Sequence, residues 1–213
     1  MIKFSDIKIV LLETSHPGNI GSVARAMKTM QFSELYVVNP LCEINDISFA
    51  MASNAKDILE STKVSKNLNL VLKDCNFVVG TTARQRDIPI EIFNPKELAD
   101  NIEKHQYGKI AILFGNESRG LTNDQLSKCN IGCHIPSNKA YTSLNIASSL
   151  QIILYEILMK SNTGMSNINK IDKKNLASHD KLAAFLEHAD KVLKDINFIK
   201  DDRPMISRKI QHI

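Results

Sequence analysis

Residues 7–27 read IKIVLLETSHPGNIGSVARAM and join a short apolar segment to an amphipathic one. Residues 7–12 are mostly apolar and rich in β-branched side chains, which is typical of a buried strand in a parallel sheet. A polar turn ends this strand, and Asn19 is a good N-cap for a helix whose apolar residues recur at helical spacing. Arg25 lies about two turns into that helix. Its side chain can reach back over the turn, or it can be an ordinary solvated arginine.

Composition bounds the size and the compartment of the protein. The chain has 213 residues, of which 43% are hydrophobic, so it can bury the core of one α/β domain with a small appendage. The formal net charge of +4 permits an RNA partner without requiring one. The first residues form no apolar signal segment, and no apolar run approaches the roughly 18 residues of a membrane span. We therefore expect a cytoplasmic protein that does not contact membranes.

The four cysteines do not form a metal-binding pattern. No Cys-x-x-Cys pair occurs, which disfavours a zinc ribbon. Cys129, Cys133 and His134 could in principle meet at a metal. Cys133 lies in an apparent strand, however, where a buried free thiol is the commoner outcome. We therefore expect no metal site.

Strand-like and helix-like segments alternate along the first 160 residues. The predicted strands are 7–12, 34–38, 76–80, 109–114 and 131–135. The predicted helices are 19–27, 47–59, 68–72, 94–104, 122–125 and 144–160. This alternation predicts an α/β fold in which helices flank a mostly parallel sheet.

Four loops that follow predicted strands carry polar residues or glycine. They are the turn before the helix that bears Arg25, and the loops at 81–86, 115–121 and 137–145. Ligands of such sheets bind beyond the carboxyl ends of the strands. The sequence therefore predicts one binding site at which the four loops converge.

Several common ligand classes are disfavoured at this site. No Gly-x-Gly-x-x-Gly follows the first strand, which disfavours a dinucleotide, and Gly108-Lys109 lacks the other residues of a phosphate-binding loop. Ser118 lacks the flanking glycine spacing of a serine nucleophile, so hydrolase chemistry is poorly supported.

Three ordered motifs resemble those of one family. They are Asn19-x-Gly21-x-x-x-Arg25, then Leu113-Phe114-Gly115-x-Glu117-x-x-Gly120-Leu121, then Ile135-Pro136 followed by Ser143-Leu144-Asn145-Ile146-Ala147. Their order and spacing resemble the SPOUT-class RNA 2'-O-methyltransferases of the SpoU/TrmH superfamily. Within the class, Thr81-Thr82-Ala83-Arg84-x-Arg86 and Tyr141 are most similar to the TrmJ-type enzymes, which methylate the ribose of nucleotide 32 in the tRNA anticodon loop. The resemblance covers residues 7–160.

This resemblance implies a deep trefoil knot at the end of the domain, with S-adenosyl-L-methionine bound in it. A tight backbone crossing would explain Gly115 and Gly120, since neither carries a Cβ. Many cofactor contacts would be main-chain groups, because adenine offers donors and acceptors that these groups satisfy. The cofactor-binding residues that the resemblance implies are Thr81, Thr82, Ala83, Gly115, Ile135, Thr142, Ser143 and Leu144.

The catalytic residues implied in the same way are Arg25, Asn19, Glu117, Ser143 and Asn145. Family mechanisms make Arg25 the base, but a guanidinium keeps its proton, with a pKa above about 12. We therefore expect Arg25 to grip phosphate and to stabilise developing oxyanion charge. Asn19 can instead serve only the loop and cap around Arg25, and Ser143 can serve only as a helix cap. Glu117 would orient an arginine or contact the other subunit.

Candidate tRNA-binding residues flank the implied cofactor site. Arg84 and Arg86 can meet backbone phosphates, although surface arginines are often merely solvated. Tyr141 offers a ring for stacking or a hydroxyl near the ribose.

The chain beyond residue 160 changes in character. Residues 161–177 are polar and form a linker, and residues 178–213 form a helical extension that is short beside those of TrmJ-like proteins. Leu182 to Ile196 carry an apolar stripe that must pack on another surface. The stripe and the resemblance both predict a homodimer, in which Arg25 of one subunit completes the site of the other.

Two alternatives stay open at this point. The same reaction on another tRNA nucleotide or on ribosomal RNA fits the three motifs equally well. A non-catalytic RNA-binding protein of the same fold would need a damaged cofactor or arginine motif, and neither motif is damaged. The preferred base at the target is not encoded by any motif.

Overall fold

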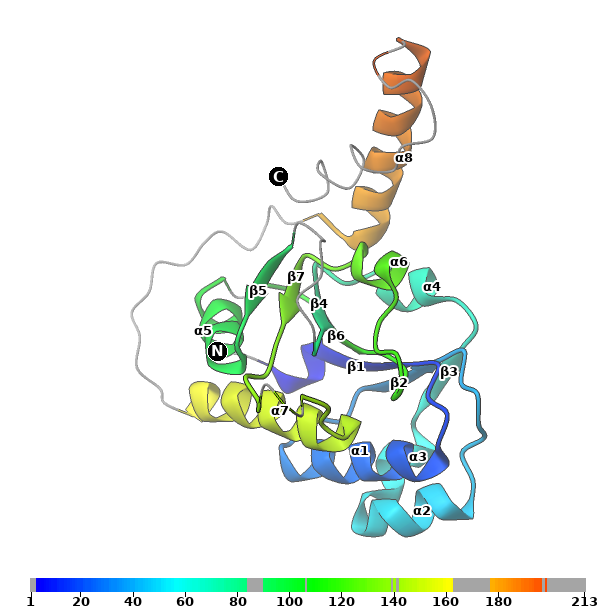
Figure 1. Cartoon of the computed structure of the whole chain (residues 1–213), viewed down its shortest axis with the longest axis vertical. Helices are drawn as coiled ribbons and strands as arrows, with labels where there is room; N and C mark the ends of the chain where they lie inside the picture. The colour runs from blue at the N-terminus through cyan, green and yellow to red at the C-terminus, as the bar shows by residue number, and fades with distance from the viewer. Residues whose placement is uncertain are drawn as a thin grey trace.

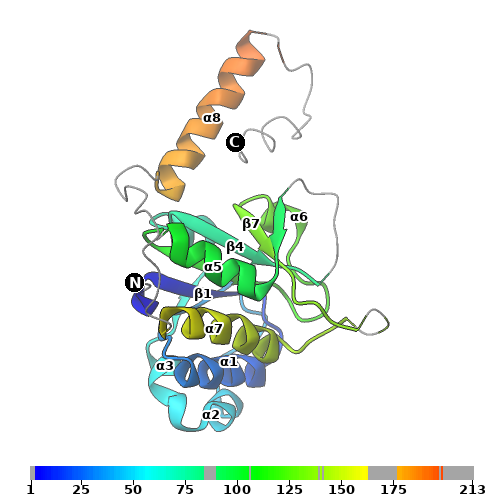
Figure 2. The same ribbon diagram turned by 90° about the vertical axis from the view of Figure 1, so that its left-hand side faces the viewer.

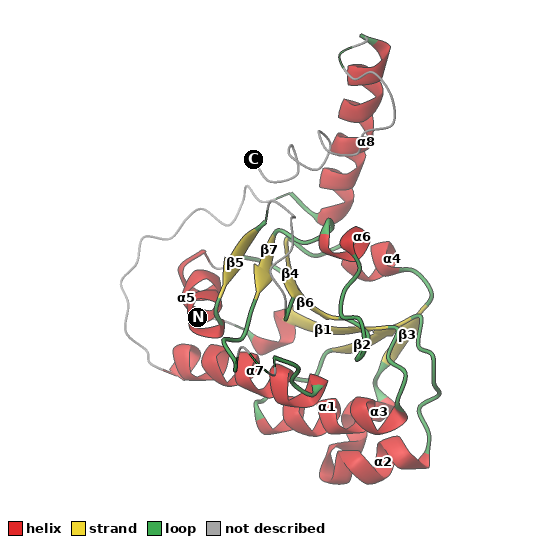
Figure 3. Cartoon of the chain, in the orientation of Figure 1, coloured by secondary structure: helices red, strands yellow, loops and turns green. Residues whose placement is uncertain are grey.

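A seven-stranded parallel sheet forms the centre of the protein (Figures 1 and 3). The computed structural model describes residues 3–83, 90–105, 107–138, 140, 142–162, 177–196 and 198. The strand order is β3-β2-β1-β6-β4-β7-β5, and every neighbouring pair is parallel, which confirms the predicted fold class. The strands are β1 (Ile7–Leu12), β2 (Leu35–Val38), β3 (Lys63–Ser65), β4 (Phe77–Thr81), β5 (Glu91–Phe93), β6 (Ile110–Phe114) and β7 (Ile131–Cys133).

Helices cover both faces of the sheet (Figures 1 and 2). They are α1 (Pro17–Thr29), α2 (Asp46–Ala52), α3 (Lys56–Glu60), α4 (Leu68–Leu72), α5 (Pro95–His105), α6 (Asn123–Leu126), α7 (Ile146–Asn162) and α8 (His179–Asp195). Two short 3-10 helices, η1 (Phe4–Asp6) and η2 (Ser53–Ala55), complete the described elements. Helices α1, α5 and α7 pack on one face, and α4 and α6 pack on the other.

Successive side chains of the central strands point to opposite faces of the sheet, so the sheet separates two apolar cores. In β1, Ile7, Ile9 and Leu11 face α1, α5 and α7. Val10 and Leu12 face the opposite core, which α4 and α6 cover. Because both faces of β1 are buried, its side chains read as an almost continuous apolar run. This strand agrees with the prediction at both ends.

The first helix begins earlier than the sequence indicated. Pro17 occupies its first turn, and the N-cap is His16, whose Nδ1 accepts a hydrogen bond from the Gly18 backbone N–H at 3.1 Å. The prediction that Asn19 is the N-cap is therefore wrong. A first-turn proline is preorganised for a helix start, so the helix absorbs the turn that seemed to precede it.

Other elements also differ from the predictions. The helix expected over 47–59 divides into α2, η2 and α3 because Ser53 has a φ of 53°, which a continuous helix does not tolerate. Strands β3 and β5 were not predicted. Both are short edge strands with mostly exposed side chains, so they lack the burial pattern that marks a strand in sequence. Helix α7 begins at Ile146 rather than at residue 144.

Helix α8 projects from the domain and is attached mainly through its first turn (Figures 1 and 2). The backbone N–H of His179 donates to the carbonyl of Cys75 at 2.8 Å, and that of Asp180 donates to the carbonyl of Lys73 at 3.3 Å. Farther along α8, Phe185 is exposed. In the described part of the chain, no helix has both the length and the apolar character needed to cross a membrane.

Candidate active site

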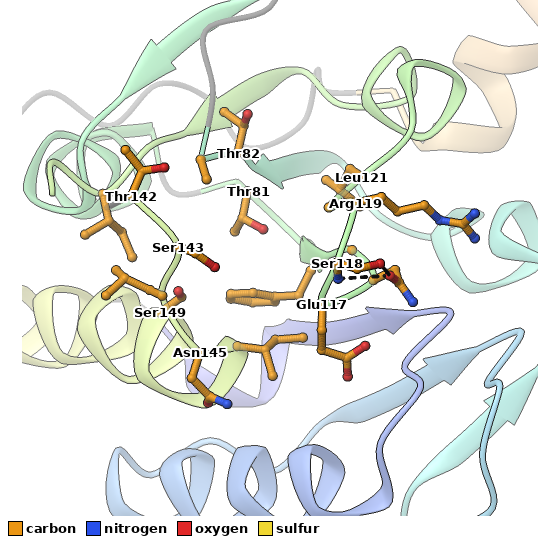
Figure 4. Close-up of a pocket in the computed structure, with 18 of the residues that line it drawn as sticks. Thr81, Thr82, Glu117, Ser118, Arg119, Leu121, Thr142, Ser143, Asn145 and Ser149 are labelled. Carbon is orange, nitrogen blue, oxygen red and sulfur yellow. Dashed lines mark hydrogen bonds between the residues drawn. The ribbon is translucent and has the colours of Figure 1, made fainter. Parts of the chain in front are cut away.

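A cavity of about 390 Å³ lies beyond the carboxyl ends of β4, β6 and β7. Its size falls in the range of small-molecule sites, roughly 300 to 1,000 Å³. Figure 4 shows Thr81 and Thr82 on one side, Ser143, Asn145 and Ser149 on a second, and Glu117 and Ser118 on a third. The four loops that the sequence predicts to converge each contribute described residues to this cavity.

All of the residues that the resemblance implies for cofactor binding line the cavity. The β4 end supplies Thr81, Thr82 and Ala83, the β6 end supplies Gly115, and the segment before α7 supplies Ile135, Thr142, Ser143 and Leu144. The Thr81 hydroxyl donates to the carbonyl of Leu113 at 2.8 Å, which ties the ends of β4 and β6 together. Apolar side chains such as Phe114 complete the lining. The cavity thus combines an apolar floor with main-chain and hydroxyl groups.

The loop over residues 115–121 is folded tightly on itself. Asn116 and Gly120 form an antiparallel bridge, and the Gly120 N–H donates to the Asn116 carbonyl at 2.7 Å. A Cβ on Gly115 would lie 2.2 Å from the carbonyl carbon of Gly120 and from the backbone nitrogen of Leu121. Gly120 has a φ of 69°, in the left-handed region that glycine tolerates. Both motif glycines therefore have a steric reason.

Glu117 joins this loop to the segment after β1. One carboxylate oxygen, Oε2, accepts hydrogen bonds from the Ser15 backbone at 3.0 Å and the Ser15 hydroxyl at 2.8 Å. The other, Oε1, accepts one from the Asn19 amide at 2.9 Å. Partial burial alone raises the pKa of Glu117, but the hydrogen bonds outweigh it and hold the pKa below its ordinary value. Glu117 is thus an ionised carboxylate held by neutral donors.

The chain of hydrogen bonds continues from Glu117 to the start of α7. Asn145 donates from Nδ2 to Oδ1 of Asn19 at 3.2 Å. The Oδ1 of Asn145 accepts the backbone N–H of Ala147 at 2.9 Å. Asn145 therefore caps α7, so the alternative that Ser143 serves only as its cap is wrong. Asn19, Glu117 and Asn145 connect three segments that are far apart in sequence.

Arg25 does not line the cavity of its own chain. It lies six positions after Asn19 on α1, a displacement of about 9 Å along the helix and about 120° around it. Its side chain is exposed to solvent. Within one chain, therefore, the cavity brings together Asn19, Glu117, Ser143 and Asn145 but leaves Arg25 outside.

The three candidate tRNA-binding residues Arg84, Arg86 and Tyr141 lie outside the described residues. Sequence reasoning also missed several polar residues of the cavity, among them Asn116 and Ser149. Asn116 is buried, donates to the Glu13 carbonyl at 2.8 Å and accepts from the Ser118 hydroxyl at 2.7 Å. Its place between motif residues Gly115 and Glu117 was the available signal. Ser149 lines the cavity from the first turn of α7, where its helical position gave no such signal.

The cysteines are free thiols in the structure. Cys129 and Cys133 are buried, and burial raises the pKa of each to about 12, so both stay protonated at neutral pH. Among the described residues, no group of three or more His, Cys, Asp or Glu side chains is placed to hold a metal ion.

Comparisons with known proteins identify the family of this chain. The tRNA (cytidine/uridine-2'-O-)-methyltransferase TrmJ of Sodalis glossinidius is 39% identical over 98% of this chain and 83% of its own length. The tRNA (cytidine/uridine/adenosine-2'-O-)-methyltransferase TrmJ of Pseudomonas aeruginosa is 38% identical over 93% and 81%. The crystal structure of TrmJ from Z. mobilis ZM4 superposes with a TM-score of 0.81 at 25% identity, covering 96% of this chain and 88% of that one. Residues 6–155 match the SpoU rRNA Methylase family, and the chain belongs to that family.

Proposed function

We propose that this protein is a cytoplasmic tRNA methyltransferase that uses S-adenosyl-L-methionine to methylate the 2'-hydroxyl of nucleotide 32 in the anticodon loop. The observation that carries the proposal is the single cavity lined by all the cofactor residues of the family motifs, beside the Asn19, Glu117 and Asn145 network. Family membership and the tRNA 2'-O-methyltransferase relatives support the reaction and its substrate class.

The cavity fits this cofactor in both chemistry and size. Thr82 and Ile135 would border the cofactor, and main-chain groups near Gly115, where a Cβ has no room, would lie against it. When bound, S-adenosyl-L-methionine supplies an electrophilic methyl group on a positively charged sulfur. The ionised carboxylate of Glu117 adds negative charge to the cavity lining, which favours a cationic ligand. The deep trefoil knot that the resemblance implies is part of this proposal, and the close approach of Gly115 to the backbone of Gly120 and Leu121 supports it.

The residues of the network would orient the target ribose. Asn145 and Ser143 present an amide and a hydroxyl at the cavity from the start of α7. Asn19 fixes the orientation of the Asn145 amide through its Oδ1, and Glu117 fixes that of Asn19. A preorganised set of donors holds the 2'-oxygen without reorganising during the reaction, which is where such a site lowers the barrier.

Arg25 would complete this site from a second subunit, so we propose that the working form is a homodimer. Arg25 is exposed on α1 and lies away from the cavity of its own chain. The neighbouring helix α7 exposes Ile152, Tyr155 and Met159 on one face, an apolar stripe of the kind that a subunit interface covers. In this arrangement the guanidinium grips an RNA phosphate and stabilises charge on the 2'-oxygen.

Methyl transfer to a defined tRNA tests the proposed function. The protein is incubated with isotopically labelled S-adenosyl-L-methionine and an unmodified tRNA transcript, and the digested product is analysed by mass spectrometry. The matched control is the same tRNA with a 2'-deoxyribose at nucleotide 32, which has no acceptor hydroxyl. We expect one 2'-O-methylated nucleoside in the first tRNA and none in the control. Label in both would place the target elsewhere in tRNA. Label in neither, together with label in ribosomal RNA supplied as a separate substrate, would change the substrate class.

Two measurements address the remaining parts of the proposal. Calorimetry with S-adenosyl-L-methionine should give a measurable Kd. A protein that binds tRNA but does not bind the cofactor would favour a non-catalytic RNA-binding role. An inactive Arg25→Ala protein mixed with an inactive Gly115→Ala protein should regain activity, because some mixed dimers contain one intact composite site. No recovery after subunit exchange would contradict the shared site.

A further inference from the structure

Glu13 lies directly after β1 and beside the cavity, without lining it. Its backbone has a φ of 55°, a left-handed conformation that costs a glutamate about 1 kcal/mol and that glycine or asparagine adopts more readily. The Glu13 N–H is satisfied by the carbonyl of Val38 at 2.9 Å. A glutamate that keeps this unfavourable backbone conformation is expected to make contacts that compensate for its cost.

The other polar contacts of Glu13 lead to the segment that follows β6. Its carbonyl accepts the Nδ2 of Asn116 at 2.8 Å. Its carboxylate forms an ion pair with Arg119 through Oε2, and its Oε1 accepts the Nε2 of Gln125 at 3.3 Å. Each carboxylate oxygen thus has a different donor, which fixes the orientation of the group. Glu13 therefore holds the 115–121 loop at two points and the start of α6 at a third.

Movement at these points would move the cavity wall. Asn116 and Arg119 both line the cavity. The loop between them is closed by the Asn116 and Gly120 bridge and leaves no space at Gly115, so it shifts as a unit. Glu117, from the same loop, reaches in the other direction to Ser15 and Asn19. Glu117, within the loop, and Glu13, outside it, therefore both fix the position of the loop relative to the segment that follows β1.

We infer that Glu13 is a positioning residue for cofactor binding, which acts by fixing the 115–121 wall of the cavity through Asn116, Arg119 and Gln125. This inference rests on the proposed function of the cavity as the S-adenosyl-L-methionine site. It concerns a residue outside the three family motifs and outside the cavity lining.

Cofactor binding and loop protection in matched variants test this role. Glu13→Gln keeps the size of the side chain and removes its charge. Glu13→Gly also removes the side chain but suits the backbone conformation, so it guards against a folding defect. The control is Glu34→Gln, which removes an ion pair with Lys63 at the amino ends of β2 and β3, the opposite end of the strands from the cavity. Calorimetry gives the Kd for S-adenosyl-L-methionine, and hydrogen exchange reports residues 113–126 in the cofactor-free protein.

We expect both Glu13 variants to bind the cofactor about tenfold more weakly, the loss that one charge-assisted contact typically gives. In steady state, the KM for S-adenosyl-L-methionine should rise with little change in kcat. Exchange over residues 113–126 should quicken in both, while Glu34→Gln matches the unsubstituted protein in every measurement. An unchanged Kd and unchanged exchange in the Glu13 variants would overturn the role of Glu13 alone. Failure of the unsubstituted protein to bind the cofactor would overturn the proposed function as well.

Discussion

The two ends of the sheet hold carboxylates in opposite ways. At the amino ends of the strands, Asp74 pairs with two cations, Lys8 and Lys109, and Lys8 is itself almost fully buried in β1. At the carboxyl ends, Glu117 accepts hydrogen bonds from the neutral groups of Ser15 and Asn19. The cations beside Asp74 stabilise the fold and cancel most of the electric field that its carboxylate would exert on a ligand. Glu117 has only neutral donors, so its negative charge acts on the cavity beside it.

The pKa values of both carboxylates are lowered, but for different reasons. Burial raises the pKa of Asp74, and hydrogen bonds from Lys109 and Lys8 outweigh it and bring the value to about 2. At Glu117, hydrogen bonds from Asn19 and Ser15 outweigh burial without any cation. A perturbed pKa alone therefore does not separate a structural group from a functional one, and the identity of its partners does.

Glu117→Gln should give the largest functional effect. The amide keeps the shape of the side chain but removes the negative charge and places a donor against Ser15. We expect kcat for methyl transfer to fall by about 100-fold, the usual effect of disturbing a preorganised polar site. The midpoint of thermal unfolding should change by only a few degrees, since one partly buried hydrogen bond contributes about 1 kcal/mol. Normal turnover in this variant would mean that Glu117 is as structural as Asp74.

Asp74→Asn should give the reverse result. Lys8, with a side chain only 9% exposed, would lose its carboxylate partner, so we expect the free energy of unfolding to fall by about 2 kcal/mol. The Kd for S-adenosyl-L-methionine should not change, because this cluster lies at the opposite edge of the sheet. Urea unfolding and calorimetry provide the two readouts. Adding Lys8→Met to Asp74→Asn should recover part of the lost stability, since no unpaired charge then stays buried; a further loss would contradict this account.

Acid should remove the stability that Asp74 provides. The pKa of Asp74 lies below its ordinary value of 3.8, so its contribution is fully present above about pH 4 and is lost as the pH falls towards about 2. The difference in unfolding free energy between the natural protein and Asp74→Asn should therefore shrink over that interval. The pKa of Glu117 is shifted in the same direction, but it cancels in this difference because both proteins contain it. A difference that stays constant down to pH 2 would exclude the ion pair as its source.

The central strands and the motif loops could be read from the sequence because local patterns determine them. Residues 7–12 are buried on both faces, and Thr122 forms a capping box with Gln125 at the helix predicted over 122–125. Strands β3 and β5 could not be read, because they exist through pairing with β2 and β7 rather than through burial of their own. Their assignment needs the tertiary structure.

Part of the cavity lining was predictable from the sequence, but its hydrogen bonds were not. The motif resemblance placed Asn19, Glu117 and Asn145 together, and the cavity gathers them. Sequence spacing gave no sign that Asn19 lies inside α1 and faces Glu117, since the cap at His16 shifts the helix start. Glu13 carries no motif signal either, because its role depends on contacts about a hundred positions away in the chain.

His134 gives the smallest expected effect, and it concerns a hydrogen bond to the backbone of Thr82, a residue that lines the cavity. Its Nδ1 lies 3.0 Å from the carbonyl oxygen of Thr82, and because a carbonyl only accepts, Nδ1 carries the proton. Asparagine places an amide near the position of Nδ1, whereas glutamine reaches that of Nε2. We expect His134→Asn to bind S-adenosyl-L-methionine within about twofold of the natural protein and His134→Gln to bind about threefold more weakly, as for the loss of one hydrogen bond to a carbonyl. An equal loss of cofactor affinity in both variants would show that the His134 ring contributes by packing rather than by donating to Thr82. A loss of affinity as large as that of Glu13→Gln would mean that the charge of a contact does not determine how much it contributes to cofactor binding.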